Sequence, residues 1–248
     1  RRLEMIHRNA TRLLNLVNQI LDFRKIDQNK EKLTLSHIDI VSFVDNICTS
    51  FRTLANSKVT LSFDSTVPSL QMSFDADKVG KIVNNLLSNA YKFTPDGGFI
   101  IVSLSIALRQ RVGDKDSDML RISVSDSGKG ISDKEKEHVF ERFYQAQGSI
   151  GGTGIGLSLV KAYVDMHHGT IDAQSELGKG TSFVVTLPDT QPGYDPANDQ
   201  KAAPRVEDKN LIDDNYVSVD IDANAAADRI TNAEDFDSER PLVLIIDD

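Results

Sequence analysis

Four segments between residues 59 and 187 alternate apolar and polar residues with a period of two. The apolar positions are Val59, Leu61 and Phe63; Ile100, Val102, Leu104 and Ile106; Leu120, Ile122 and Val124; and Phe183, Val185 and Leu187. This period is typical of β-strands with one covered face. Apolar residues at helical spacing lie between the strands, over residues 79–90 and 155–167. The combination predicts a two-layer α/β sandwich with helices on one side of the sheet.

Residues 1–28 carry apolar residues at alternating spacings of three and four. Those residues are Leu3, Ile6, Ala10, Leu13, Val17 and Ile20. Such a seam is typical of a helix that packs against partner helices. Leu14, Leu16 and Leu21 widen the apolar face, which favours a small helical bundle, such as one made by two chains, over a lone coiled coil. The alternative is a terminal helix packed on its own domain.

Composition narrows the function classes. The formal net charge of −9 resides mainly after residue 188, so the preceding part is nearly neutral and lacks the basic, aromatic surface of a nucleic-acid-binding protein. No apolar run approaches the ~20 residues of a membrane-spanning helix, and the first residues lack the apolar stretch of a secretion signal. Cys48 is the single cysteine and is expected to be buried and inert. We therefore expect a soluble globular protein from a reducing compartment.

The end of the chain differs from the rest. Residues 189–240 contain several prolines, many Asp and Asn residues and little periodicity, which predicts an acidic linker. Residues 241–248 form a short apolar run that ends in two aspartates, interpreted as the start of another strand, with an arbitrary apolar terminus as the alternative. The predicted units are a helix at 1–30, an α/β domain at 31–188, the linker and this final strand.

One face of the predicted helix at residues 79–90 and just beyond carries two amides and an ammonium group. At 100° per residue, Asn85, Asn89 and Lys92 lie together on a face beside the apolar stripe. An amide oxygen is a hard, neutral ligand that suits Mg²⁺, and a nearby lysine suits phosphates that share the metal. The motif predicts a site for metal-bound phosphate, with a solvated polar face as the alternative.

Two further motifs adjoin predicted strands. Asp126-Ser-Gly128-Lys-Gly130-Ile131 follows the strand that ends at Val124. A carboxylate there can accept a hydrogen bond from the exocyclic amine of adenine, while the glycines let the backbone approach the ring. Gly178-Lys-Gly180-Thr181 leads into the last strand. Each pattern also fits an ordinary turn.

A glycine-rich motif lies at the start of the predicted helix at residues 155–167. Gly151-Gly152-Thr153-Gly154-Ile155-Gly156-Leu157 supplies backbone N–H groups and a positive helix end for phosphates. No strand precedes the motif, since residues 138–150 are predicted to be loop and short helix, so a Rossmann fold is excluded. No Gly-Lys-Ser or Gly-Lys-Thr follows, which excludes a Walker-type P-loop.

In this order, and with Phe140-Glu-Arg-Phe143 between them, the motifs resemble the N, G1, F, G2 and G3 boxes of sensor histidine kinases. This family belongs to the gyrase, Hsp90, kinase and MutL ATPase superfamily, and the resemblance covers about residues 1–188. It implies the Bergerat fold, a mixed sheet under three helices, preceded by a long dimerisation-type helix. It also implies ATP bound between helices and a mobile lid at about residues 145–153.

The resemblance implies a role for each motif residue. Asn89 would bind Mg²⁺, while Asn85 would occupy the position where related ATPases keep a glutamate that activates water. An amide cannot take a proton, as suits a kinase that holds ATP unhydrolysed. Lys92 would meet phosphate, Phe93 would stack on adenine, and Arg142 would reach the γ-phosphate during transfer. The remaining nucleotide contacts would be Asn85, Asp126, Gly128, Gly130, Ile131, Gly152, Thr153, Gly154, Ile155, Gly156, Leu157 and Thr181.

None of the five histidines is followed by the acidic residue and nearby proline of the family's phosphoacceptor. The resemblance therefore implies that residues 1–30 are the second helix of a dimerisation hairpin and that the acceptor lies on a helix absent from this chain. Residues 241–248 resemble the start of a receiver domain, which implies a hybrid kinase. The expected partners are a second copy, through the hairpin, and a receiver domain in cis or a response regulator. The expected location is the cytoplasmic portion of a membrane-anchored protein.

The favoured interpretation is transfer of the γ-phosphoryl group of Mg-ATP to a histidine. One alternative is an ATPase of the gyrase or MutL kind, which Asn85 and the Phe-Glu-Arg-Phe motif disfavour. A second alternative is a nucleotide-responsive interaction module that regulates a partner by opening and closing its lid.

Overall fold

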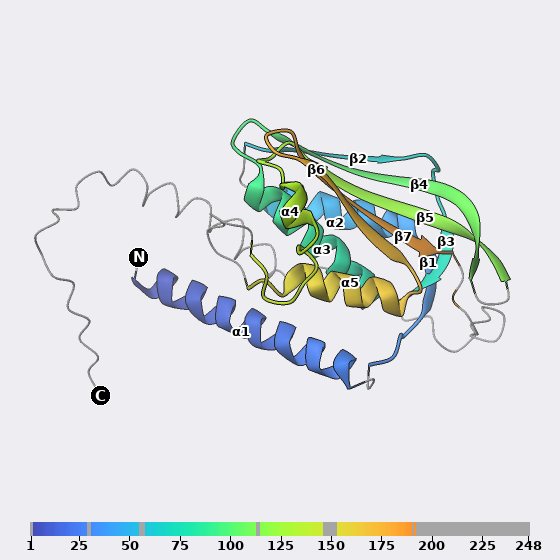
Figure 1. Cartoon of the computed structure of the whole chain (residues 1–248), viewed down its shortest axis with the longest axis horizontal. Helices are drawn as coiled ribbons and strands as arrows, with labels where there is room; N and C mark the ends of the chain where they lie inside the picture. Colours follow the sequence, from blue (N-terminus) through green and yellow to red (C-terminus); the bar gives the residue numbers. More distant parts are fainter. Residues whose placement is uncertain are drawn as a thin grey trace, which may run out of the picture.

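The computed structural model describes residues 2–28, 31–54, 58–112, 115–145, 153–189 and 191. Figure 1 shows the order and arrangement of the elements. The helices are α1 (Arg2–Asp27), α2 (Ile40–Leu54), α3 (Ala76–Phe93), α4 (Asp133–Lys136) and α5 (Gly156–Met166). The strands are β1 (Ser36–Asp39), β2 (Thr60–Ser65), β3 (Gln71–Phe74), β4 (Phe99–Val112), β5 (Lys115–Asp126), β6 (Thr170–Glu176) and β7 (Gly180–Pro188). The predicted strand at residues 241–248 and nearly all of the predicted linker lie outside the described residues.

Five strands form a mixed sheet in the order β2-β4-β5-β7-β6. Strands β2 and β4 run parallel, and the other neighbours are antiparallel. Val102 lies opposite Val124, and Val124 lies opposite Phe183, so the apolar rows with a period of two meet on one face. Strands β1 and β3 form a separate antiparallel pair.

Helices α2, α3 and α5 cover that apolar face of the sheet (Figure 1). Ile47 of α2, Leu86 of α3 and Val164 of α5 are fully buried in one core that also contains Val102 of β4. The opposite face is polar at its centre, where the hydroxyls of Ser123, Ser125 and Ser182 lie 2.8–3.3 Å apart. The predicted two-layer α/β sandwich, with a mixed sheet under three helices, is confirmed.

Both ends of α3 are defined by hydrogen bonds, which fixes the helix that carries the amide motif. Asp75 is the N-cap, and its carboxylate accepts from the backbone N–H of Lys78 at 3.1 Å. The ammonium of Lys78 lies 3.0 Å from the carboxylates of both Asp75 and Glu31. At the other end, Thr94 donates its backbone N–H to Ala90, and Pro95 follows.

Helix α1 occurs where the sequence predicts a helix, and its last turns contact the domain. Phe23 and Ile26 pack against the core, which matches the alternative of packing on its own domain. Six other large apolar side chains of this helix are about half exposed or more: Ile6, Leu13, Leu14, Val17, Ile20 and Leu21. These contacts do not test whether the exposed face packs in a helical bundle, so the bundle stays a prediction.

The folded domain extends slightly beyond the predicted boundary at Pro188. Asp189 donates its backbone N–H to Asp118 and accepts from Ser73, so it joins β5 to β3. Gln191 is only 5 % exposed. The sequence did not indicate this extension, because two polar residues just after the end of a strand leave no signal in composition.

A buried histidine ties α5 to the start of α3. His167 is fully buried, and its Nε2 accepts from the backbone N–H of Asp75 at 3.2 Å. Its Nδ1 lies 2.8 Å from the carbonyl of Tyr163, to which it must therefore donate. This pattern requires a neutral ring, and burial lowers the pKa of His167 below its usual value.

We expect the free energy of unfolding to fall as the pH is lowered through about 6.5, because the unfolded chain then binds a proton that the folded His167 resists. The slope from this residue approaches about 1.4 kcal/mol per pH unit. Urea unfolding between pH 5 and 7.5 measures it. His167→Gln should flatten the profile, whereas His138→Gln should not, because the contact with Glu141 raises the pKa of the exposed His138 and so acts in the opposite direction. Equal slopes in the unmutated and His167→Gln proteins would contradict this role.

Candidate nucleotide-binding site

The amide motif on α3 faces the beginning of α5. Asn85 is 7 % exposed, and its Nδ2 donates to the carbonyl of Lys81 at 2.8 Å. Its Oδ1 is directed at Gly156, where a Cβ atom would lie 2.8 Å from that oxygen. Asn89 and Lys92 follow along the same helix and are half-buried. A buried amide oxygen and the N-terminus of a helix are thus brought to one place.

The turn before α5 leaves backbone N–H groups for an anion. Ile155 is the N-cap of α5 and makes no side-chain capping hydrogen bond. Its own N–H donates to the hydroxyl of Thr153 at 3.2 Å. Gly154 has φ +68° and accepts a hydrogen bond from the backbone of Phe143 at 2.8 Å, which ties the turn to the Phe-Glu-Arg-Phe motif. First-turn N–H groups together with the helix dipole favour phosphate at this position.

The opposite wall is formed by the ends of β5 and β7. Asp126 ends β5 directly opposite Thr181 of β7. The carboxylate of Asp126 accepts from the backbone N–H of Gly128 at 2.8 Å. Burial raises the pKa of Asp126, and hydrogen bonds from the backbones of Gly128 and Thr181 partly offset that effect. The result is a half-buried acceptor at the mouth of the sheet.

Ser175 of β6 supports this wall and was missed by the sequence reasoning. Its hydroxyl receives the N–H of Ile131 at 2.8 Å and donates to the carbonyl of Gly180 at 2.8 Å. It also lies 2.9 Å from the hydroxyl of Thr181. The only available signal was that Ser175 continues the inward-facing row of Ile171 and Ala173, where a polar residue needs partners.

Phe93 lies where α3 ends and the Asp126 loop passes. Its ring has the ammonium of Lys92 at 4.9 Å from the centroid and that of Lys129 at 5.1 Å. The carbonyl of Phe93 crowds the position where a Cβ atom of Gly128 would lie. The aromatic ring, two ammonium groups and the Asp126 loop therefore meet at one end of α3.

Arg142 is placed apart from these groups. Its guanidinium donates to Asp27 of α1 at 3.0 Å and stacks on the ring of Phe23, 4.0 Å from the centroid. Gly152 and most of the predicted lid at residues 145–153 lie outside the described residues. The structure brings together the motifs of α3, α5, β5 and β7, while Arg142 contacts α1.

Two absences concern the described residues. Among them, no group of three or more His, Cys, Asp or Glu side chains is placed to hold a metal ion. No described helix is both long and apolar enough to cross a membrane.

Comparison with known families and proteins gives a consistent set of relatives. Residues 74–191 match the family described as histidine kinase-, DNA gyrase B-, and HSP90-like ATPase. Sensor histidine kinase TmoS of Ectopseudomonas mendocina is 36 % identical over an alignment that covers 100 % of this chain and 25 % of TmoS. Hybrid signal transduction histidine kinase D of Dictyostelium discoideum is 38 % identical, with 75 % of this chain and 12 % of that protein covered. The chain thus spans a quarter or less of these relatives.

Solved structures agree with the sequence relatives. Full-length ShkA in complex with AMPPNP superimposes with a TM-score of 0.63 and 25 % identity, over 74 % of this chain and 37 % of that one. The mycobacterial sensor histidine kinase MprB gives a TM-score of 0.52 and 26 % identity, over 64 % of this chain and 99 % of that one.

Proposed function

Because this chain belongs to the histidine kinase-, DNA gyrase B-, and HSP90-like ATPase family and carries the ATP-binding catalytic domain of a two-component sensor kinase, we propose that it transfers the γ-phosphoryl group of Mg-ATP to a histidine on a separate helix. One observation carries this proposal: the amide oxygen of Asn85 faces the start of α5 at Gly156, so the helix that carries both motif amides lies against a phosphate-binding helix end.

The proposed adenine site is the wall formed by the ends of β5 and β7. The carboxylate of Asp126 would accept a hydrogen bond from the exocyclic amine, with Thr181 beside it and Phe93 stacked on the base. Gly128, Gly130 and Ile131 would border the ring. The hydrogen bonds that hold Asp126 in place support this assignment, because a fixed acceptor loses little entropy on binding.

Phosphate recognition is assigned to the turn before α5. Backbone N–H groups from Gly152 through Leu157 would surround the phosphates, and Lys92 would add a positive charge. The residues in that stretch are Gly152, Thr153, Gly154, Ile155, Gly156 and Leu157. The uncapped N-terminus of α5 supports the assignment, since its N–H groups need acceptors.

The donor set fits Mg²⁺. Asn89 is the proposed protein ligand, and Asn85 lies one turn away with its oxygen directed at α5. When bound, Mg²⁺ would neutralise charge on the β- and γ-phosphates during transfer. Neither amide can act as a general base toward water, so the chain's own groups position ATP without activating its hydrolysis. The amide of Asn85, in place of the glutamate that activates water in related ATPases, disfavours an ATPase of the gyrase or MutL kind.

The wider organisation is also proposed. Residues 1–30 would be the second helix of a dimerisation hairpin, with the exposed apolar face of α1 supporting contact with other helices. Two-component partners in general follow from the kinase relatives, and a second copy and a receiver domain are the specific partners proposed. The parent protein would be membrane-anchored, with this portion in the cytoplasm.

Calorimetric titration with ATP and GTP tests the nucleotide site. We expect micromolar-range or weaker ATP binding and much poorer GTP binding, because the guanine carbonyl would meet the carboxylate of Asp126. Asp126→Asn should weaken ATP binding about 10- to 100-fold, since a charge-assisted acceptor is lost. Asp172→Asn on the outer row of β6 serves as the control and should leave affinity unchanged. Comparable ATP and GTP affinities in the unmutated protein would count against this pocket and favour the interaction-module alternative.

A further inference from the structure

Helix α1 reaches the glycine-rich turn through a buried amide. Gln19 is 8 % exposed although it lies on a helix with a largely exposed apolar face. Its Oε1 accepts a hydrogen bond from the hydroxyl of Thr153 at 3.0 Å. Thr153 in turn receives the N–H of Ile155, at the first turn of α5. The hydroxyl proton that Thr153 would offer to a phosphate is therefore already donated to α1.

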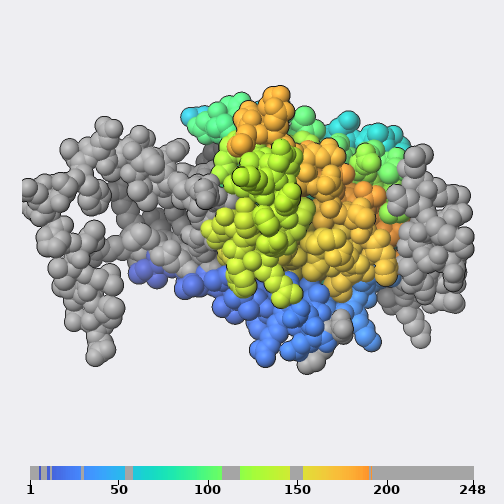
Figure 2. Space-filling model, in the orientation of Figure 1, coloured from blue at the N-terminus to red at the C-terminus, as the bar shows by residue number. Residues whose placement is uncertain are grey.

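Helices α1, α3 and α5 meet at Asp22 of α1. Its Oδ2 accepts from the ammonium of Lys81 on α3 at 2.8 Å and from the hydroxyl of Tyr163 on α5 at 3.0 Å. The side chains of Asp22 and Lys81 are only 20 % and 25 % exposed. Because the pair is partly buried, dissolved salt screens it less than it screens a surface pair. The junction holds α1 against the two helices that form the candidate site. Figure 2 shows the blue surface of α1 beside the yellow surface of α5.

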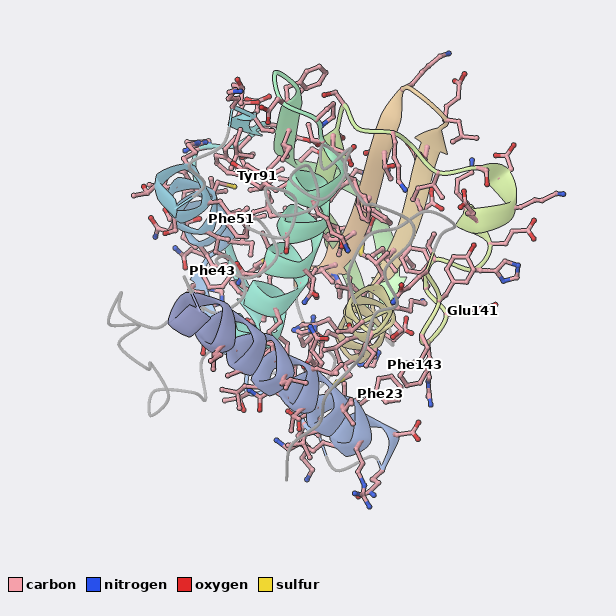
Figure 3. All side chains as sticks on the ribbon, turned by 90° about the vertical axis from the view of Figure 1, so that its left-hand side faces the viewer. Phe23, Phe43, Phe51, Tyr91, Glu141 and Phe143 are labelled. Atoms are coloured by element: carbon pink, nitrogen blue, oxygen red, sulfur yellow. The ribbon has the colours of Figure 1, made fainter. Side chains whose placement is uncertain are left out.

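The end of α1 engages the Phe-Glu-Arg-Phe motif. Figure 3 shows Phe23 next to the segment that carries Glu141 and Phe143. The guanidinium of Arg142 stacks on Phe23 and donates to Asp27. The ion pair is more than half exposed and is weak by itself, but the stacking fixes the direction of the guanidinium. Arg142 is thus directed at α1.

We infer that α1 and the terminal phosphate of ATP compete for Thr153 and Arg142, so that docking of α1 and binding of the triphosphate oppose each other. This competition presupposes the proposed nucleotide site and goes beyond it. Thr153 cannot donate one proton to both Gln19 and a phosphate, and Arg142 cannot reach a γ-phosphate while it stacks on Phe23. ADP lacks the γ-phosphate that Arg142 would bind, so it discriminates poorly between the docked and undocked states. Because coupling is reciprocal, the triphosphate releases α1 to the same extent that α1 weakens triphosphate binding.

Variants of α1 should therefore change the affinity for AMPPNP, which has a γ-phosphate, and not the affinity for ADP. Gln19→Leu and Asp22→Asn each should tighten AMPPNP binding by about 5-fold or more and change ADP binding less than about 2-fold. Asn18→Leu and Arg24→Gln alter exposed neighbours on the same helix and should change neither. Calorimetry with the whole chain measures all four. Tyr163→Phe removes only the hydroxyl that donates to Asp22 and provides a mild second disruption if either α1 variant fails to fold.

Amide hydrogen exchange gives the reciprocal readout. AMPPNP should accelerate exchange across residues 19–27 of α1, and ADP should not. An unchanged AMPPNP-to-ADP affinity ratio in the folded variants, or equal exchange with both nucleotides, would overturn the competition while leaving the nucleotide site intact. Failure of both nucleotides to bind the unmutated chain would instead overturn the proposed function, and the competition with it.

Discussion

Asn89→Ala should abolish Mg-dependent ATP binding while the protein remains folded. Asn89 is half-buried on α3 and lies outside the apolar core, so the substitution removes an amide without opening a core cavity. Loss of residues that merely support a metal ligand costs 10- to 100-fold in metal affinity, so loss of the ligand itself should cost on the order of 100-fold or more. Calorimetric titration of ATP with and without Mg²⁺ measures this, and circular dichroism checks the fold.

Two companion variants sharpen that experiment. Asn46→Ala changes an exposed amide on α2 and should leave Mg-ATP binding unchanged. Asn89→Asp retains an oxygen ligand and should retain Mg dependence. Unchanged Mg-ATP affinity in folded Asn89→Ala would remove this residue from the metal site.

Gly180→Ala should destabilise the domain by at least about 2 kcal/mol. Gly180 has φ +101°, and a Cβ atom there would collide with the backbone oxygen of Asp126. The collision involves two backbones in paired strands, so no side-chain rotation relieves it. The displaced strand is the one that ends in Asp126, so ATP affinity should fall as well.

Gly178→Ala provides a matched control in the same turn. Its φ is +79°, but nothing lies within 4 Å of the position of its Cβ. It should cost only the left-handed conformation, roughly 1–2 kcal/mol. Urea unfolding of both variants separates the two effects. Equal losses of stability would show that the close approach of Gly180 to Asp126 carries no energetic weight.

Much of the site follows from local patterns. The period-two rows place Val124 on the covered face of β5, and the chain then reaches Asp126 at the end of the strand, so its position beside the sheet mouth was predictable. The helical spacing of Asn85 and Asn89 likewise predicted a polar wall beside the apolar stripe of α3. Both predictions rest on repeats within one element, which sequence displays directly.

The remaining features depend on contacts between distant elements. Arg142 was expected at the γ-phosphate, yet it lies against α1 because Phe23 and Asp27, more than a hundred residues earlier, present a ring and a carboxylate to it. Ile106 was predicted on the covered face but is 46 % exposed. Its partner on β5, Leu120, is buried, and periodicity does not indicate where along a strand the covering layer ends.

The short strands β1 and β3 were missed for a similar reason. Each has only four residues, too few for a period to be recognised. Their pairing instead depends on tertiary context, including the hydrogen bond from Ser73 to Asp189 beyond the end of β7.

Transfer of phosphate to a separate acceptor tests the central claim most directly. The chain would be incubated with Mg-ATP labelled in the γ-phosphate and with a two-helix hairpin that carries a histidine followed by an acidic residue and a nearby proline. The account predicts acid-labile, base-stable label on that histidine, none on this chain alone, and none when Asn89→Ala replaces the unmutated protein. Steady release of inorganic phosphate with no phosphohistidine on the hairpin would contradict the account and assign the domain to ATP hydrolysis.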